Sequence, residues 1–161
     1  MAVKDILLLG DSRLYEHALQ VKQAELPWIQ EVIRDLHDTL LDFRKKFGAG
    51  RAIAAPQIGV PKRLIYLYIN EPPVIFINPQ LTDKSDEMME IWDDCMSFPN
   101  LYVKVLRHKK CTITYRDLTW QKNSLPLEGD LAELLQHEYD HLNGILAVSR
   151  ALDGQSFALR R

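Results

Sequence analysis

The chain has 161 residues, of which 47 % are hydrophobic and 26 % charged, and its formal net charge is −2. This length and composition predict one soluble globular domain, residues 1–161, able to bury a core without covalent support. The balanced charge gives no reason to expect a nucleic-acid or membrane surface. Two cysteines, Cys95 and Cys111, are too few for a disulfide-stapled secreted domain.

The first residues contain one short apolar run, residues 6–9, between Asp5 and Asp11. The run is too short to be the core of a signal peptide or a membrane span. No transit peptide is visible either. We therefore expect a cytoplasmic protein in a reducing compartment.

The first regular element is expected at residues 27–47. Apolar residues recur there at three- and four-residue steps, with acids and bases between them. Pro27 suits a first helical turn, and Gly48 and Gly50 end a helix. The pattern predicts an amphipathic helix.

Strand-like segments come next, rich in aromatic and β-branched residues. They are residues 63–69, 74–78, 101–107 and 111–116. Pro79 is expected to end the second segment, and the last two segments are expected to pair across the polar residues 108–110. A second helix is predicted at residues 130–143, with Gly144 just after it. Successive strands without intervening helices favour an α+β fold with antiparallel sheets over a doubly wound parallel sheet.

The second helix contains the pattern His-Glu-x-x-His, formed by His137, Glu138 and His141. Residues four apart lie on one face of a helix, so both imidazoles can bind one metal ion. Glu138 projects from nearly the same side and can act as a general base without being a ligand. The alternative is an ordinary helix with two half-buried histidines and an exposed glutamate.

A hydrolytic metal site needs a third protein ligand and one open position. No histidine follows His141, and Asp153 is the only acidic residue downstream. Cys95 lies in a polar, turn-prone segment before a strand and is the candidate thiolate. The alternative for Cys95 is a small buried apolar residue. Cys111 alternates within a strand and is assigned to packing.

A third segment, residues 48–59, is rich in small residues that let another backbone approach closely. It lacks the Lys-Ser/Thr pair of a phosphate-binding loop. A peptide-binding edge, with Gln57 as a hydrogen-bond donor, fits better. Taken alone, the segment would be an ordinary loop leading into a strand.

Together, the three segments resemble the peptide deformylase family. Its Gly-rich segment ending in Gln corresponds to residues 50–57, its Glu-Gly-Cys-Leu-Ser segment to residues 93–97, and its His-Glu-x-Asp-His helix to residues 137–141. The order and spacing match as well, and three motifs in register are far more specific than one. The resemblance implies antiparallel sheets around a central metal-binding helix, with an N-terminal helix outside.

The resemblance also implies roles for individual residues. Cys95, His137 and His141 would bind one divalent metal, often Fe(II), with Ni, Co or Zn as substitutes. Glu138 would move the proton, while the Gln57 side chain and the Met96 backbone N–H would stabilise the oxyanion. The residues expected to contact the substrate are Gly50, Arg51, Ala52 and Ile53. The substrate would be an N-formyl-methionyl nascent peptide, met at the ribosome, and the products formate and a free N-terminal methionine.

Several positions depart from the family pattern. Asp93 replaces Glu, and Asp94 replaces Gly directly before Cys95, where a positive φ would be costly. Arg51 and Ala52 replace an apolar residue and a glycine. We interpret Arg51 as extending into solvent. Glu133, one turn before His137, is expected to be exposed, and Asp93 is expected to pair with Arg107.

Other functions stay open at this level. One is a metallohydrolase of the same fold with a different amide or peptide substrate, suggested by Arg51, Ala52 and Asp94. Another is a non-catalytic binding protein that kept the fold, although every proposed metal and acid–base residue is present. A zincin-type endoprotease would lack its usual third ligand and would give Gln57 and Cys95 no role.

Overall fold

A computed structural model describes residues 2–160, so Met1 and Arg161 lie outside the described part of the chain. The long helix α1 spans Leu26–Phe47 and α2 spans Asp130–Leu142. The strands are β1 Ala52–Ala54, β2 Leu64–Leu67, β3 Val74–Thr82, β4 Met88–Asp93, β5 Leu101–His108, β6 Lys110–Arg116, β7 Lys122–Glu128 and β8 Phe157–Leu159. Short 3-10 helices are η1 Ser12–Tyr15, η2 Gln23–Glu25, η3 Ala55–Ile58 and η4 Ala147–Arg150.

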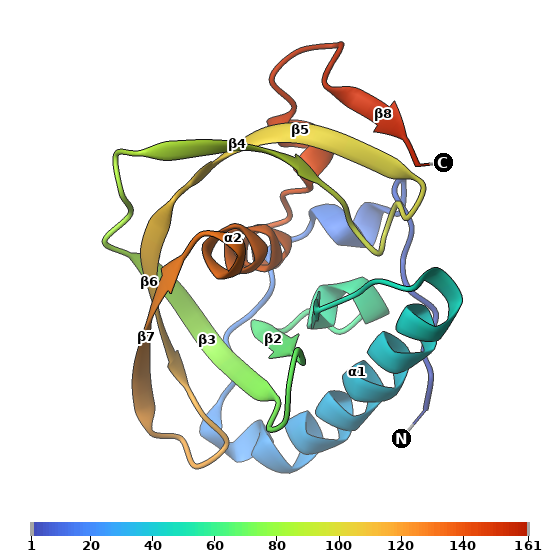
Figure 1. Cartoon of the computed structure of the whole chain (residues 1–161). Coiled ribbons are helices and arrows are strands. Elements are labelled where there is room, and N and C mark those ends of the chain that lie inside the picture. The colour runs from blue at the N-terminus through green and yellow to red at the C-terminus, as the bar shows by residue number, and fades with distance from the viewer. Residues whose placement is uncertain (1, 161) are drawn as a thin grey trace.

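Two antiparallel sheets enclose α2. The larger has the strand order β1-β2-β3-β6-β7 and the smaller β4-β5-β8. Figure 1 shows α2 near the middle of the molecule, between β3, β6 and β7 on one side and β4 and β5 on the other. The predicted α+β class with antiparallel sheets around a central helix is confirmed.

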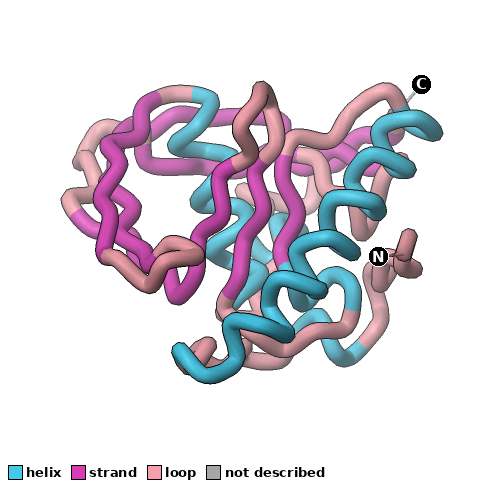
Figure 2. The backbone as a smooth tube through the Cα atoms, turned by 90° about the horizontal axis from the view of Figure 1, so that it is seen from below, coloured by secondary structure: helices cyan, strands magenta, loops and turns pink. Residues whose placement is uncertain are grey.

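The first helix packs on the outer face of the larger sheet. Its buried residues include Ile29, Val32, Leu36, Leu40 and Phe43, spaced as one apolar stripe. Gly48 ends it with a left-handed φ of 69°, as predicted. Figure 2, seen from below, shows this helix crossing the neighbouring strands.

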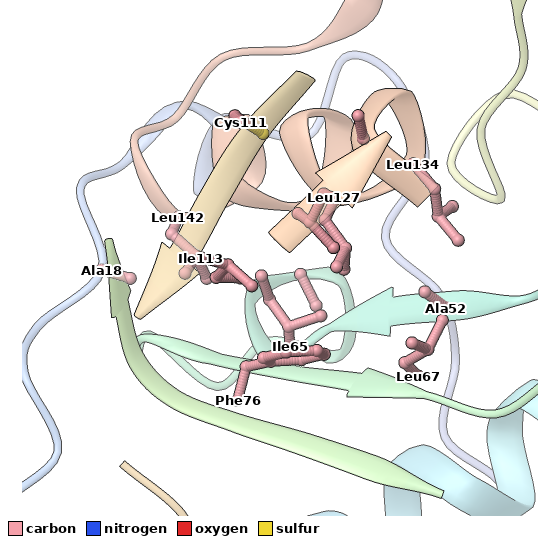
Figure 3. Close-up of a cluster of buried hydrophobic side chains, with 13 residues drawn as sticks. Ala18, Ala52, Ile65, Leu67, Phe76, Cys111, Ile113, Leu127, Leu134 and Leu142 are labelled. Carbon is pink, nitrogen blue, oxygen red and sulfur yellow. The ribbon is translucent and has the colours of Figure 1, made fainter. Parts of the chain in front are cut away.

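The strands under α1 are buried on both faces because a helix covers each side. Leu64 and Tyr66 of β2 point toward α1, whereas Ile65 and Leu67 point toward α2. Figure 3 shows the α2 side of this core, where Ile65 and Phe76 lie beneath side chains from β6, β7 and α2. A strand with no exposed face requires apolar residues at every position, which explains its unbroken apolar sequence.

Two details of the strand prediction are wrong. Pro79 does not end the second strand, because β3 runs on to Thr82 through a register shift between Ile77 and Gln80. At this bulge Asn78 takes a φ of 50°, and a proline is tolerated where the hydrogen-bond ladder is interrupted.

The second error concerns strand partners. Strands β5 and β6 do not pair with each other, since β5 lies between β4 and β8 and β6 lies between β3 and β7. The chain therefore passes from one sheet to the other near Lys109. The amide of Gln136 on α2 fixes this crossing, because its Oε1 accepts from the His108 N–H at 2.9 Å and its Nε2 donates to the His108 carbonyl at 2.8 Å.

Within residues 2–160, no helix is both long enough and apolar enough to cross a membrane.

Candidate active site

The three predicted metal ligands lie together. Cys95 follows the end of β4, and His137 and His141 lie one turn apart on α2. Their ligand atoms are all within 4.8 Å of one another, and Cys95 Sγ is 3.3 Å from His141 Nε2. All three residues are buried. The fold thus brings a residue of the smaller sheet's loop against the central helix.

An acidic neighbour fixes the orientation of the first histidine. His137 Nδ1 lies 2.9 Å from Asp93 Oδ2, which leaves His137 Nε2 directed at Cys95 and His141. Such a carboxylate partner selects the imidazole tautomer that a metal needs. The predicted pair is present as well: Arg107 Nη2 donates to Asp93 Oδ2 at 2.8 Å. Arg107 Nη1 also donates to Asp140, at 2.6 Å.

The loop before Cys95 is not strained. Asp94 does not have a positive φ. In the described chain, the non-glycine residues that do are Asn78, Asp83 and Trp120. The replacement of a glycine by Asp94 therefore carries no left-handed backbone cost. Its side chain is exposed at the edge of the cavity.

Electrostatics at the three ligands favour a cation. Burial acts to lower the pKa of His137, but the Asp93 carboxylate and then Cys95 outweigh it and raise that pKa well above its usual value. Burial, followed by the nearby His137, holds the pKa of His141 well below its usual value. His141 is thus kept as the neutral imidazole that metals bind, while the space between Asp93 and Cys95 attracts positive charge.

The donor set fits a divalent transition metal. Metal–ligand bonds of about 2.0 to 2.3 Å place neighbouring ligand atoms about 3.5 Å apart in a tetrahedral site. The observed 3.3 Å between Cys95 Sγ and His141 Nε2 is close to this value. One thiolate and two imidazoles suit borderline metals and leave a fourth position open.

Glu138 is enclosed beside the ligands. Its side chain is buried, and among the described residues its Oε1 has no hydrogen-bond partner. Burial raises the pKa of Glu138 to about 7. A carboxyl group with such a pKa, and with one oxygen that makes no hydrogen bond, can exchange a proton near neutral pH. The alternative of an exposed glutamate on an ordinary helix is wrong.

The predicted oxyanion donors border the same space. Gln57 on η3 is buried; its Oε1 accepts from the Ala54 N–H at 3.0 Å, and its Nε2 lies 3.6 Å from Cys95 Sγ. Ser97, which the sequence reasoning did not single out, holds that amide through its Oγ at 3.2 Å. Its only sequence signal is its place in the segment around Cys95. Met96 is buried and lines the cavity.

A cavity of about 290 Å³ opens onto these groups. Gly50, Arg51 and Ala52 contribute to its wall, whereas Ile53 is fully buried in the core beneath α1. The other lining residues are Phe43, Ala49, Gln57, Asp93, Asp94, Cys95, Met96, Pro99, Glu133, Leu134, His137, Glu138 and Arg160. A contact between these residues and a substrate stays a prediction.

One expectation at the cavity wall is wrong, and a second is incomplete. Glu133 is not an exposed acid, since its side chain is only 13 % exposed and its Oε1 lies 3.0 Å from Arg51 Nη2. Arg51 is exposed, as expected, but its guanidinium is also held at the cavity wall by this contact. The two residues are 82 positions apart in the chain, so no local sequence signal could reveal the pair.

A buried cysteine and two histidines beside a carboxylate, on an α+β scaffold, are typical of a metal-dependent hydrolase. The family profile described as polypeptide deformylase matches residues 3–156. The chain therefore belongs to the peptide deformylase family.

Similarity to individual peptide deformylases supports this assignment to the family. A peptide deformylase of Carboxydothermus hydrogenoformans is 37 % identical over 94 % of this chain and 95 % of its own length. The crystal structure of a peptide deformylase from Legionella pneumophila superposes with a TM-score of 0.86 at 35 % identity, covering 96 % of this chain and 89 % of that one. The crystal structure of a peptide deformylase from Synechococcus elongatus in complex with actinonin superposes with a TM-score of 0.86 at 30 % identity. The match covers 95 % of this chain and 81 % of that one.

Proposed function

We propose that this protein removes the N-formyl group from the N-terminal formyl-methionine of newly made polypeptides and releases formate. The observation that carries the proposal is the cluster of Cys95, His137 and His141, of which Cys95 and His137 line one cavity together with Glu138. Family membership supports the same reaction. The nascent chain, met at the ribosome in the cytoplasm, is the proposed partner.

We assign the metal to Cys95, His137 and His141, with Fe(II) as the native ion and Ni, Co or Zn as substitutes. When bound, a divalent cation supplies Lewis acidity toward the formyl carbonyl and lowers the pKa of water. Asp93 holds His137 in the ligating orientation. Both cysteines are buried free thiols, which is consistent with a reducing compartment.

The remaining steps belong to this chain's own groups. Glu138 Oε1 accepts a proton from the attacking water, whose oxygen bonds to the formyl carbon. Gln57 Nε2 and the Met96 N–H donate to the oxygen that becomes negative, in the manner of an oxyanion hole. The carbon–nitrogen bond then breaks, and Glu138 passes its proton to the leaving amine. The products are formate and the free N-terminus.

The test is anaerobic formate release from a formyl-Met peptide by protein loaded with Fe(II) or Ni(II). We expect Glu138→Gln to keep its metal and to lose activity by about 100-fold or more, because general acid–base transfer is removed. Glu128→Gln, on an exposed position of β7, is the matched control and should keep activity. Absence of formate from fully metallated, unaltered protein would refute the proposed function.

A further inference from the structure

An ion pair forms part of the wall of the catalytic cavity. Arg51 Nη2 and Glu133 Oε1 are 3.0 Å apart, with 42 % and 13 % of their side chains exposed. Both residues line the cavity that contains Cys95, His137 and Glu138. Burial raises the pKa of Glu133, and Arg51 is the first group that opposes this rise. The pair is thus a feature of the cavity itself and not of the outer surface.

The pair lies along the cavity wall next to His137. Glu133 lies one helical turn before His137 on the same face of α2, so the two side chains are neighbours along the cavity. The backbone of Arg51 is fixed opposite, because its carbonyl accepts from the Tyr68 N–H at 2.9 Å. A formyl group held beside Cys95 and His137 would place the side chain of its own residue along this wall.

The pair has hydrogen-bonding capacity beyond its mutual contact. A guanidinium group carries five N–H donors and a carboxylate about four acceptor positions, and the contact between Arg51 and Glu133 uses one of each. An apolar side chain against this wall removes water from the pair without replacing its hydrogen bonds. A side chain with both an acceptor and a donor can bond to Arg51 and Glu133 together.

Hydrogen-bond complementarity to Arg51 and Glu133 favours a neutral amide over a charged side chain. An acidic side chain would meet Arg51 but also Glu133, Asp94 and Glu138. A basic side chain would be attracted by the same three acidic groups, but it would be repelled by Arg51 and has no acceptor to offer the guanidinium. A primary amide offers its oxygen to the guanidinium and its N–H to the carboxylate, and it adds no charge.

We propose that Arg51 and Glu133 determine first-residue specificity and let the enzyme deformylate substrates whose first side chain is a neutral amide of methionine's length, as well as formyl-methionine. This inference rests on the proposed function and deepens it. It concerns the chemistry of one subsite and leaves the roles of the metal ligands and Glu138 unchanged.

The test compares kcat/KM for formyl-Met-Ala-Ser and formyl-Gln-Ala-Ser, whose first side chains are similar in length. We expect the two values to lie within about threefold of each other for the unaltered enzyme. In Arg51→Leu/Glu133→Leu, the ratio should shift by about tenfold or more toward formyl-Met, because the hydrogen-bonding wall becomes apolar. Glu133→Gln, which keeps donor and acceptor atoms, should retain the ratio of the unaltered enzyme.

The control is Lys110→Leu/Glu128→Leu, which removes an exposed ion pair from β6 and β7 and should leave the ratio unchanged. Arg51→Met, at the more exposed position, replaces the double variant if the latter does not fold. Binding is measured separately by calorimetry in a Glu138→Gln background. There, Arg51→Met should weaken binding of the formyl-Gln peptide and leave binding of the formyl-Met peptide unchanged.

The possible failures are distinguishable. Strong discrimination against formyl-Gln by the unaltered enzyme, with the same ratio in Arg51→Leu/Glu133→Leu, overturns this inference and leaves the deformylase function standing. Absence of formate from both peptides, in metallated protein, overturns the proposed function and the inference with it.

Discussion

At the scale of single residues, Asp93 connects the metal ligands to the rest of the protein. It accepts hydrogen bonds from His137 and from Arg107, and it is itself buried. These contacts lower the pKa of Asp93 even though burial acts to raise it. The carboxylate is therefore ionised at neutral pH, and its negative charge lies next to the site that must hold a cation.

We predict that Asp93→Asn lowers metal affinity by about 10- to 100-fold, as is usual when a carboxylate that orients a ligating histidine is lost. The amide can still accept from His137, but it no longer supplies charge. Competition with a chelator, measured on folded protein, gives the affinity. Asp94→Asn is the matched control, since this neighbour is exposed and should change affinity little. Equal losses in the two variants would contradict the role given to Asp93.

At the scale of elements, the sequence predicts what local periodicity determines. Both helices follow from their apolar stripes, and the pattern at His137 and His141 follows from the helical turn. The division of strands into two sheets does not follow, because one partner of each strand, β8 for β5 and β3 for β6, is remote in the chain. The same limit applies to Arg51 and Glu133, whose contact exists only after α2 packs against β1.

The end of α2 depends on a glycine. Gly144 has a φ of 71°, and a Cβ built on it would collide with the Tyr15 carbonyl oxygen. The helix end is also tied to the N-terminal segment, because the Ala18 N–H donates to the Leu142 carbonyl at 2.9 Å. The close approach of these two segments explains why no side chain is tolerated here.

We predict that Gly144→Ala lowers the free energy of unfolding by about 2 to 4 kcal/mol, through backbone strain and the collision with Tyr15. Gly154→Ala is the control, because nothing lies within 4 Å of its added Cβ and its φ is not positive. Urea denaturation measures both. If the two variants unfolded at the same urea concentration, the close approach at Gly144 would not constrain the protein.

At the scale of the whole molecule, the metal site joins two parts of the fold. Cys95 belongs to the loop between β4 and β5, in the smaller sheet, whereas His137 and His141 belong to the central helix. Arg107 on β5 makes a second connection between these parts, since it donates to Asp140 on α2, and Arg150 on η4 donates to the same carboxylate. A metal that bonds to all three ligands would therefore stabilise the packing of the smaller sheet against α2, beyond its part in catalysis.

This arrangement predicts that metal binding raises the stability of the whole protein. An ion that binds only the folded state adds about 2.7 kcal/mol at 100 times its Kd. Ni(II) or Zn(II) added to metal-free protein should thus raise Tm, as measured by calorimetry.

Cys95→Ser should lose most of this rise, because the hydroxyl is a far weaker ligand than a thiolate. Cys111→Ser removes the other buried thiol, which packs in the core between the larger sheet and α2. It should lower Tm of the metal-free protein and still show the full rise on adding metal. An equal rise in Cys95→Ser and in the unaltered protein would mean that the ion does not join the loop to the helix.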